Sequence, residues 1–299
     1  MRLATIRTGG AERLALVDPD GGALTLPAAG RPGPAGLSEL PGLPELLRRG
    51  PEAWAELAGR GPSGPRLPLA DVELLAPLPR PVNNLFALGL NYTDHGEEAY
   101  RAAGREYRRP RHPVVFTKDR RCVAAPVGPL GIDFSLSREI DWEVELAVVI
   151  GRRAWRVQEA AALDHVFGYC VANDITARDL QTRHKQYYLS KSLPGSCPLG
   201  PWITTADEVP DPHDLAITLS VNGVPRQVSR TDQLVFSIPE TIAAISRIVP
   251  LEPGDVILTG TPAGTGFAAD PPGYLAPGDV VECSIEGLGT LSNRITALD

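Results

Sequence analysis

Residues 139–151 carry the strongest structural signal in the chain and read EIDWEVELAVVIG. Every even position from 140 to 150 is apolar, which is the alternation expected for one face of a β-strand. The odd positions are acidic at 139, 141, 143 and 145 and apolar at 147 and 149. The sequence therefore predicts a strand whose acidic end lies in a site and whose other end lies in the core.

Two of these acids, Glu143 and Glu145, point the same way if the segment is a strand, with Cβ atoms about 6.5–7 Å apart. Two carboxylates held that close repel each other, and a bound cation relieves the repulsion. An edge strand with a solvated acidic face explains the same pattern, because charged residues protect sheet edges from aggregation. The pattern alone leaves both interpretations open.

Composition limits the possible partners. The 299 residues include 29 basic and 36 acidic side chains, for a net charge of −7. This balance, without long blocks of one sign, argues against a nucleic-acid surface and favours small molecules as partners. No run of about 18 apolar residues could cross a membrane, and the N-terminal residues MRLATIRT lack an apolar signal core. We therefore expect a cytoplasmic protein.

The order of the elements predicts an α+β fold that is mainly β. Short apolar runs up to residue 26 indicate hairpin strands, and residues 43–57 indicate a leucine-rich helix interrupted at Gly50-Pro51. Prolines recur through residues 61–68 and suggest a domain boundary nearby. We predict a small N-terminal β/α domain over residues 1–73 and a larger domain over residues 74–299.

The four cysteines are widely spaced without a C-x-x-C pair, which indicates buried free thiols.

A polar cluster follows the strand predicted over residues 84–90. If a helix starts near Thr93, His95 and Glu98 lie side by side on it, and the carboxylate can orient the imidazole as a general base. A pair on a solvated helix surface is the alternative. The arginine-rich segment 99–113 suits either a lid over an anionic substrate or a solvated loop.

Further candidates lie downstream of the acidic strand. A strand over residues 166–172 ends at Asn173-Asp174, and Asp174 can supply a third oxygen ligand beside Glu143 and Glu145. Residues 176–179, TARD, have the form of a capping box, which accounts for Asp179. Lys191 near a metal-bound substrate would stabilise negative charge, although a surface role is the alternative.

Residues 259–266 read TGTPAGTG and are too glycine-rich to be strand throughout. They lack the spacing and the Gly-Lys-Ser/Thr end of a P-loop, so nucleotide binding is not indicated. We predict a loop whose backbone amides approach a carboxylate.

Five phrases together resemble the fumarylacetoacetate hydrolase family and occur in the order typical of it between residues 85 and 295. They are GLNYTDH at 89–95, EVEL at 143–146, NDITARDLQ at 173–181, KS at 191–192 and LTGTP at 258–262. The first seventy or so residues look like the smaller N-terminal domain that some members carry.

The resemblance implies a mixed β-roll catalytic domain, usually a homodimer, that binds Mg²⁺ or Mn²⁺ and acts on a small 2-oxo acid. The positions that match the family's site residues are Glu143, Glu145 and Asp174 as metal ligands, His95, Glu98 and Lys191 as catalytic residues, and Gln181 and Thr261 as substrate-binding residues.

Three functions remain open at this point. The leading hypothesis is a metal-dependent hydrolase that cleaves a carbon–carbon bond in an acylpyruvate or fumarylacetoacetate-like 2,4-dioxo acid, as in the catabolism of aromatic compounds. The first alternative is a decarboxylase of an oxaloacetate-like acid or an isomerase of a 2-hydroxymuconate-type diacid such as 2-hydroxyhepta-2,4-diene-1,7-dioate. The second is a non-catalytic β-domain that holds a structural ion.

Overall fold

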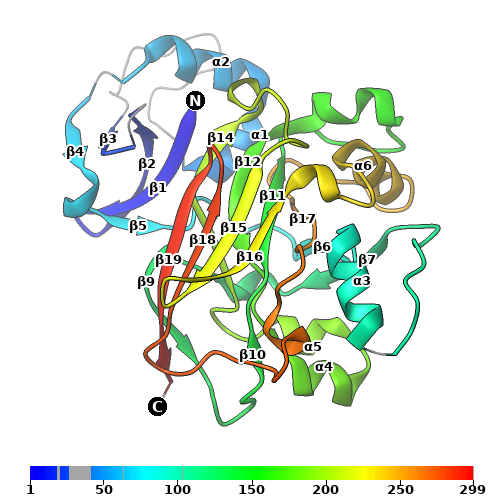
Figure 1. The fold of residues 1–299 in the computed structure, drawn as a ribbon. Helices are drawn as coiled ribbons and strands as arrows, with labels where there is room; N and C mark the ends of the chain where they lie inside the picture. Colours follow the sequence, from blue (N-terminus) through cyan, green and yellow to red (C-terminus); the bar gives the residue numbers. More distant parts are fainter. Residues whose placement is uncertain (19–20, 27–41, 63, 103, 299) are drawn as a thin grey trace.

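The computed structural model describes residues 1–18, 21–26, 42–62, 64–102 and 104–298. Two β-sheets pack face to face, and the helices lie around them (Figure 1). The larger sheet has twelve strands, which are β1 (Arg2–Thr8), β2 (Ala11–Val17), β3 (Ala23–Thr25), β4 (Arg66–Pro68), β5 (Glu73–Leu75), β6 (Leu85–Gly89), β7 (Val114–Lys118), β8 (Val123–Ala124), β11 (Val144–Ile150), β12 (Val166–Asn173), β14 (Cys197–Thr205) and β17 (Val256–Leu258).

The second sheet has five strands in the order β16-β15-β18-β19-β9, and β10 pairs with β13 alone. The bounds of these strands are β9 (Val127–Ile132), β10 (Ile140–Asp141), β13 (Thr176–Ala177), β15 (Ala216–Val221), β16 (Val224–Arg230), β18 (Val280–Ile285) and β19 (Gly289–Ala297). The α-helices are α1 (Leu43–Arg49), α2 (Pro51–Arg60), α3 (Thr93–Ala102), α4 (Arg178–His184), α5 (Tyr187–Lys191) and α6 (Ile238–Ser246). The 3₁₀ helices are η1 (Leu69–Asp71), η2 (Arg120–Cys122), η3 (Glu159–His165), η4 (Ala206–Glu208), η5 (Thr231–Gln233) and η6 (Gly266–Ala268). The fold is therefore mainly β with added helices, as the sequence predicts.

The stretch 139–151 is not one continuous strand, because β10 belongs to the two-stranded sheet and only β11 lies inside the large sheet. β10 ends at Asp141 and β11 begins at Val144. The interruption coincides with Asp141, whose Oδ1 accepts a hydrogen bond from the Trp142 amide at 2.8 Å. β11 is buried throughout and lies between β12 and β17, so the edge-strand interpretation is wrong.

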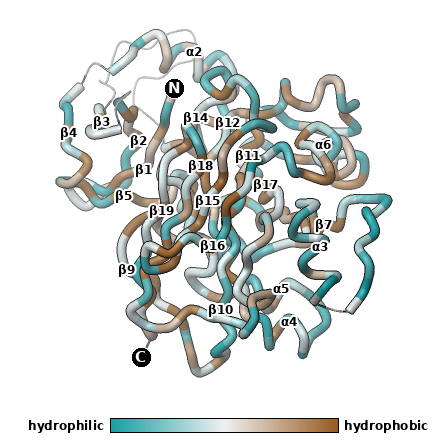
Figure 2. The backbone as a smooth tube through the Cα atoms, viewed as in Figure 1, coloured by the Kyte–Doolittle hydropathy of each residue, from teal (hydrophilic) through white to brown (hydrophobic). Residues whose placement is uncertain are grey.

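The two faces of β11 enter two different cores. Its even-numbered apolar residues, together with Ile140 and Trp142, pack in the core between the two sheets. Ala147 and Val149 pack on the opposite face, in the core that includes the leucines of α1 and α2. In Figure 2 the central strands carry much of the hydrophobic colour, and the loop after α3 is largely hydrophilic. The alternation in the sequence therefore reports which core each residue joins.

The N-terminal segment is continuous with the rest of the fold. β1 pairs with β14, and the predicted helix is interrupted at Gly50, where φ is +79°. The boundary predicted between residues 73 and 74 falls within β5, which also pairs with β1. The division into two domains remains a prediction.

Several local signals in the sequence match the structure, and one prediction is wrong. Asn222 and Gly223, a pair typical of hairpin turns, form such a turn with φ of +54° and +74°, and Ser237 forms a capping box with Glu240. The alanine-rich residues 159–165 form the 3₁₀ helix η3. The capping box predicted at residues 176–179 is absent, because α4 begins after Ala177 without a side-chain cap.

The four cysteines are buried free thiols, as predicted. No helix in the described part of the chain is both long enough and apolar enough to span a membrane.

Candidate active site

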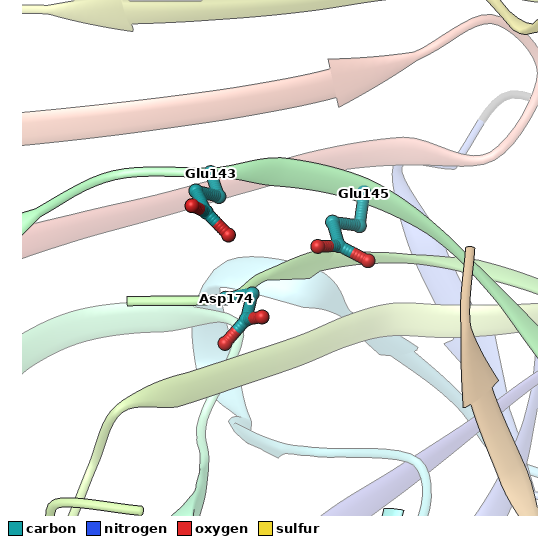
Figure 3. A group of neighbouring side chains, drawn as sticks. All are labelled: Glu143, Glu145 and Asp174. Carbon is teal, nitrogen blue, oxygen red and sulfur yellow. The ribbon is translucent and has the colours of Figure 1, made fainter. Parts of the chain in front are cut away.

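Three buried carboxylates converge where β11 and β12 lie side by side. Glu143 directly precedes β11, Glu145 lies within it, and Asp174 directly follows β12. The two strands are antiparallel with Val144 opposite Asn173, so the acidic start of one meets the acidic end of the other. One oxygen from each residue lies within 4.8 Å of the others. Figure 3 shows Glu143 and Glu145 projecting from one strand towards Asp174.

Two buried lysines neutralise part of this charge. Nζ of Lys191 donates to Glu143 Oε2 and Asp174 Oδ2, both at 2.6 Å, and to Thr176 at 2.9 Å. Nζ of Lys118 donates to the other oxygen of Asp174 at 2.5 Å and to the Ser196 carbonyl at 2.9 Å. Lys118 was not among the site residues predicted from the sequence. Its signal is a lysine that ends an apolar strand, since such a residue must find a counter-charge if it is buried.

Arg178 provides a third cation, which was also not predicted as a site residue because it lies inside the predicted capping box. Its Nη2 lies 2.5 Å from Glu143 Oε1, and its Nε donates to Asp141 at 2.8 Å. Asp141 is fully buried and also accepts hydrogen bonds from the amides of Gly266 and Phe267 at 2.6 and 3.1 Å. Arg178 therefore links Glu143, a candidate metal ligand, to the loop at residues 266–267 through Asp141.

The carboxylates differ in how strongly their surroundings favour ionisation. Burial opposes ionisation of Glu143, but Lys191 and Arg178 outweigh it and lower the pKa of Glu143 to about 2. Burial raises the pKa of Glu145 well above its usual value, and the charges of Asp174 and Glu143 raise it further. The Gly260 amide, 2.7 Å from Glu145 Oε2, only partly offsets this. Without a cation, Glu145 therefore holds a proton more readily than Glu143.

The donor set suits a hard divalent cation. All three candidate ligands are carboxylates, which Mg²⁺ and Mn²⁺ prefer, and the absence of nitrogen and sulfur disfavours zinc. If every group is ionised, the four acids, including Asp141, carry −4 and the three cations carry +3, which leaves −1. Among the described residues, Glu145 Oε1 has no hydrogen-bond partner. The residual charge and this oxygen both fit an added cation.

His95 and Glu98 lie together on α3, with His95 Nδ1 3.5 Å from Glu98 Oε2. His95 is only 7% exposed, so the pair does not sit on a solvated helix surface. Glu98 also accepts hydrogen bonds from the Gly264 amide at 3.0 Å and the Thr265 hydroxyl at 3.3 Å. Burial would raise the pKa of Glu98, but the hydrogen bonds from His95 and Gly264 outweigh it and the pKa is lowered.

The glycine-rich loop brings its backbone amides to three carboxylates, and these are the protein's own. Gly260 donates to Glu145, Gly264 to Glu98 and Gly266 to Asp141. One loop therefore fixes a metal-ligand candidate, the partner of His95 and the partner of Arg178.

Thr261, in the same loop, already has two hydrogen bonds within the protein. Its hydroxyl donates to the Val144 carbonyl at 2.9 Å and accepts from Gln227 Nε2 at 2.8 Å. Gln227 is fully buried on β16 and was not among the site residues predicted from the sequence. A contact between Thr261 and a substrate carboxylate remains a prediction.

One pocket of about 370 Å³ connects these groups. Six of the predicted site residues line it: His95, Glu143, Glu145, Gln181, Lys191 and Thr261. Asp174 and Glu98 lie behind this wall and contact Lys191 and His95. The remaining wall includes Phe116, Phe267, Tyr100, Tyr187, Arg105 and Arg178. The structure thus gathers every predicted site residue around one cavity.

Known proteins share this arrangement of sequence and fold. The family model described as fumarylacetoacetate (FAA) hydrolase C-terminal matches residues 84–296. Oxaloacetate tautomerase YisK of Bacillus subtilis (strain 168) is 43% identical over 227 residues, which cover 76% of this chain and 74% of that protein.

Several solved structures are similar over the whole chain, and two of them are informative about the site. The fumarylacetoacetate hydrolase of Exiguobacterium antarcticum superimposes with a TM-score of 0.83 at 37% identity, covering 100% of both chains. The maleylpyruvate hydrolase of Sphingobium sp. SYK-6, solved with manganese(II) and pyruvate, gives a TM-score of 0.78 at 29% identity, again over 100% of both chains. The relatives are enzymes, and this protein belongs to the fumarylacetoacetate hydrolase family.

Proposed function

We propose that this protein is an Mg²⁺- or Mn²⁺-dependent enzyme that enolises a 2-oxo acid, with keto–enol tautomerisation of oxaloacetate as its reaction. The observation that carries the proposal is the shared pocket, in which His95 faces the same cavity as Glu143, Glu145 and Lys191. The similarity to the Bacillus oxaloacetate tautomerase supports this reaction, and the manganese of the Sphingobium relative supports the metal.

Glu143, Glu145 and Asp174 would hold the cation. When bound, it would supply Lewis acidity towards the 2-oxo group. Lys191 would add a fixed positive charge where an enolate oxygen develops, because Glu143 and Asp174 hold its Nζ in place. Burial would lower the pKa of Lys191, but the charges of Asp174 and Glu143 raise it, so the ammonium form persists.

His95 would move the proton. Its Nδ1 faces Glu98, so a proton on Nδ1 leaves Nε2 as the atom that accepts a proton from the carbon next to the 2-oxo group and returns it. Phe267 lies edge-on to the imidazole, with ring centroids 6.3 Å apart, and together with Phe116 gives this wall an apolar surface. An apolar wall limits competing proton transfer with water.

Hydrolysis of a carbon–carbon bond is the second candidate, and it was the leading hypothesis from the sequence. The His95–Glu98 pair favours it, because a histidine oriented by a carboxylate can also activate water. The Sphingobium maleylpyruvate hydrolase shares the fold.

Decarboxylation of oxaloacetate needs no activated water and would leave pyruvate as product. A structural ion site would not require a histidine–glutamate pair in the same pocket.

Assays with purified protein and Mg²⁺ or Mn²⁺ separate these reactions. We expect faster conversion of enol-oxaloacetate to the keto form, monitored by loss of enol absorbance, without added pyruvate formation. Pyruvate formation would favour decarboxylation, and faster cleavage of an acylpyruvate at equal concentration would favour hydrolysis. The predicted homodimer and cytoplasmic location remain predictions, and sedimentation analysis tests the first.

A further inference from the structure

Arg105 differs from the other charged side chains of the pocket wall. Arg178 and Lys191 are paired with buried carboxylates, and Glu143 is paired with both of them. Within the described part of the chain, the Arg105 guanidinium has no hydrogen bond, ion pair or ring contact, and its side chain is exposed. The pocket therefore has one cation that is still available to a ligand.

The segment that carries Arg105 contacts α3, the helix that carries His95. The Arg105 amide donates to the Tyr100 carbonyl at 2.8 Å, at the end of α3. Tyr107 packs edge-on against Tyr100 with ring centroids 5.6 Å apart, and a Cβ at Gly96 would overlap the Tyr107 ring. The position of Arg105 is thus linked to that of α3.

Arg109 fastens the same segment on its other side. Its Nη2 donates to the Val235 carbonyl at 2.7 Å, and its guanidinium lies over the Phe236 ring at 5.2 Å. Arg101, Arg108 and Arg111 do not line the pocket. Of the arginines in segment 99–113, Arg105 alone combines a place on the pocket wall with an unpaired guanidinium among the described residues.

We propose that Arg105 binds the second carboxylate of a dicarboxylate substrate and thereby selects 2-oxo diacids over 2-oxo monoacids. This role rests on the proposed function, which places the 2-oxo acid end of the substrate at Glu143, Glu145 and Asp174. That end of the pocket is acidic, so a second carboxylate needs a cation away from it. A guanidinium matches a carboxylate with two parallel hydrogen bonds, which a lysine cannot reproduce.

Two non-reactive probes isolate this contact. N-oxalylglycine has an oxalyl end and a second carboxylate, whereas N-ethyloxamate has the same oxalyl end and a methyl group in place of the second carboxylate. Their dissociation constants would be measured by calorimetry with Mg²⁺ in the wild type, Arg105→Gln and Arg108→Gln. Arg108 is an exposed arginine of the same segment, so its variant controls for the lost charge.

In Arg105→Gln we expect about 10-fold weaker binding of N-oxalylglycine, the low end for a charge-assisted hydrogen bond because the site is exposed. Binding of N-ethyloxamate should be unchanged, and Arg108→Gln should bind both probes like the wild type. In the enol-oxaloacetate assay, KM should rise with kcat nearly constant.

An equal loss for both probes, or no loss for either, would overturn the role of Arg105 and leave the proposed function in place. Failure of both probes to bind the wild type with Mg²⁺ would overturn the proposed function, and this role with it.

Discussion

Nζ of Lys118 lies 2.5 Å from Oδ1 of Asp174, and both side chains are fully buried. Burial would lower the pKa of Lys118, but the charge of Asp174 raises it above its usual value. A buried lysine paired in this way stays charged, so its removal leaves Asp174 Oδ1 without its charged partner and Lys191 as the one remaining cation in contact with this carboxylate among the described residues.

Lys118→Met should destabilise the metal-free protein by about 3–5 kcal/mol, the usual cost of breaking a buried ion pair. Urea unfolding without divalent metal measures this loss. The double variant Lys118→Met/Asp174→Asn should lose less than the single variant, because no charge is left unpaired. Unfolding of Lys118→Met at the wild-type urea concentration would show that the pair is not needed for stability.

Glu143→Gln, Glu145→Gln and Asp174→Asn should each weaken Mg²⁺ binding by at least about 10-fold, because each removes a charged oxygen ligand from the cluster. Calorimetric titration measures the affinity, and circular dichroism checks that the fold is kept. Glu139→Gln is the matched control, since this acid belongs to the same stretch and lies outside the cluster. Unchanged affinity in all three site variants would remove these residues from the metal site.

Mg²⁺ affinity should rise with pH, because the pKa of Glu145 in the metal-free protein is raised by burial and by neighbouring acids. Below this raised pKa the metal must displace a proton, and above it no proton is released. Calorimetry from about pH 5 upwards, which starts above the usual pKa of glutamate, should show the trend. Glu145→Gln should bind more weakly and with a flatter pH dependence. A wild-type affinity independent of pH would contradict the raised pKa.

The same shift predicts the sign of a stability effect. A folded-state pKa above the unfolded value stabilises the fold below the unfolded pKa, and this contribution is lost as pH rises through the folded pKa. Without metal, the wild type should therefore lose stability relative to Glu145→Gln as pH rises. Thermal unfolding of both proteins at each pH, with and without Mg²⁺, gives the comparison. A stability difference that stays constant across the pH range would refute this linkage.

His95→Ala should slow the metal-dependent reaction by about 10²–10⁴, the usual contribution of a positioned general base. Glu98→Gln should have a milder effect, because it leaves the imidazole in place and removes only its charged partner. The pKa of Glu98 is lowered, so its charged form persists below the usual glutamate pKa and is lost only as pH falls through the lowered value. The measurement is kcat/KM in both variants and in Glu97→Gln, an exposed neighbour that should behave like the wild type. Full activity in His95→Ala would exclude the imidazole from proton transfer.

The sequence by itself determined the features that depend on neighbours along the chain. The alternation in residues 139–151 predicted an apolar face and a strand with its acidic end in a site and its other end in the core, and Glu143 and Glu145 project together because side chains two apart leave a strand on the same face. The turn at Asn222-Gly223 and the capping box at Ser237 are local in the same sense. His95 and Glu98 meet because they are three residues apart on a helix.

Only the tertiary structure decided which distant residues the site side chains contact. Lys118 and Asp174 are 56 positions apart, Gln227 and Thr261 are 34 apart, and Gly260 and Glu145 are 115 apart. Arg178 reaches Glu143 across 35 positions, which is why a local capping pattern misassigned its neighbourhood. Burial leaves polar groups without water, so they pair with whatever partners the packed sheets bring within reach. No local pattern encodes those partners, because they are set by strand register and sheet packing.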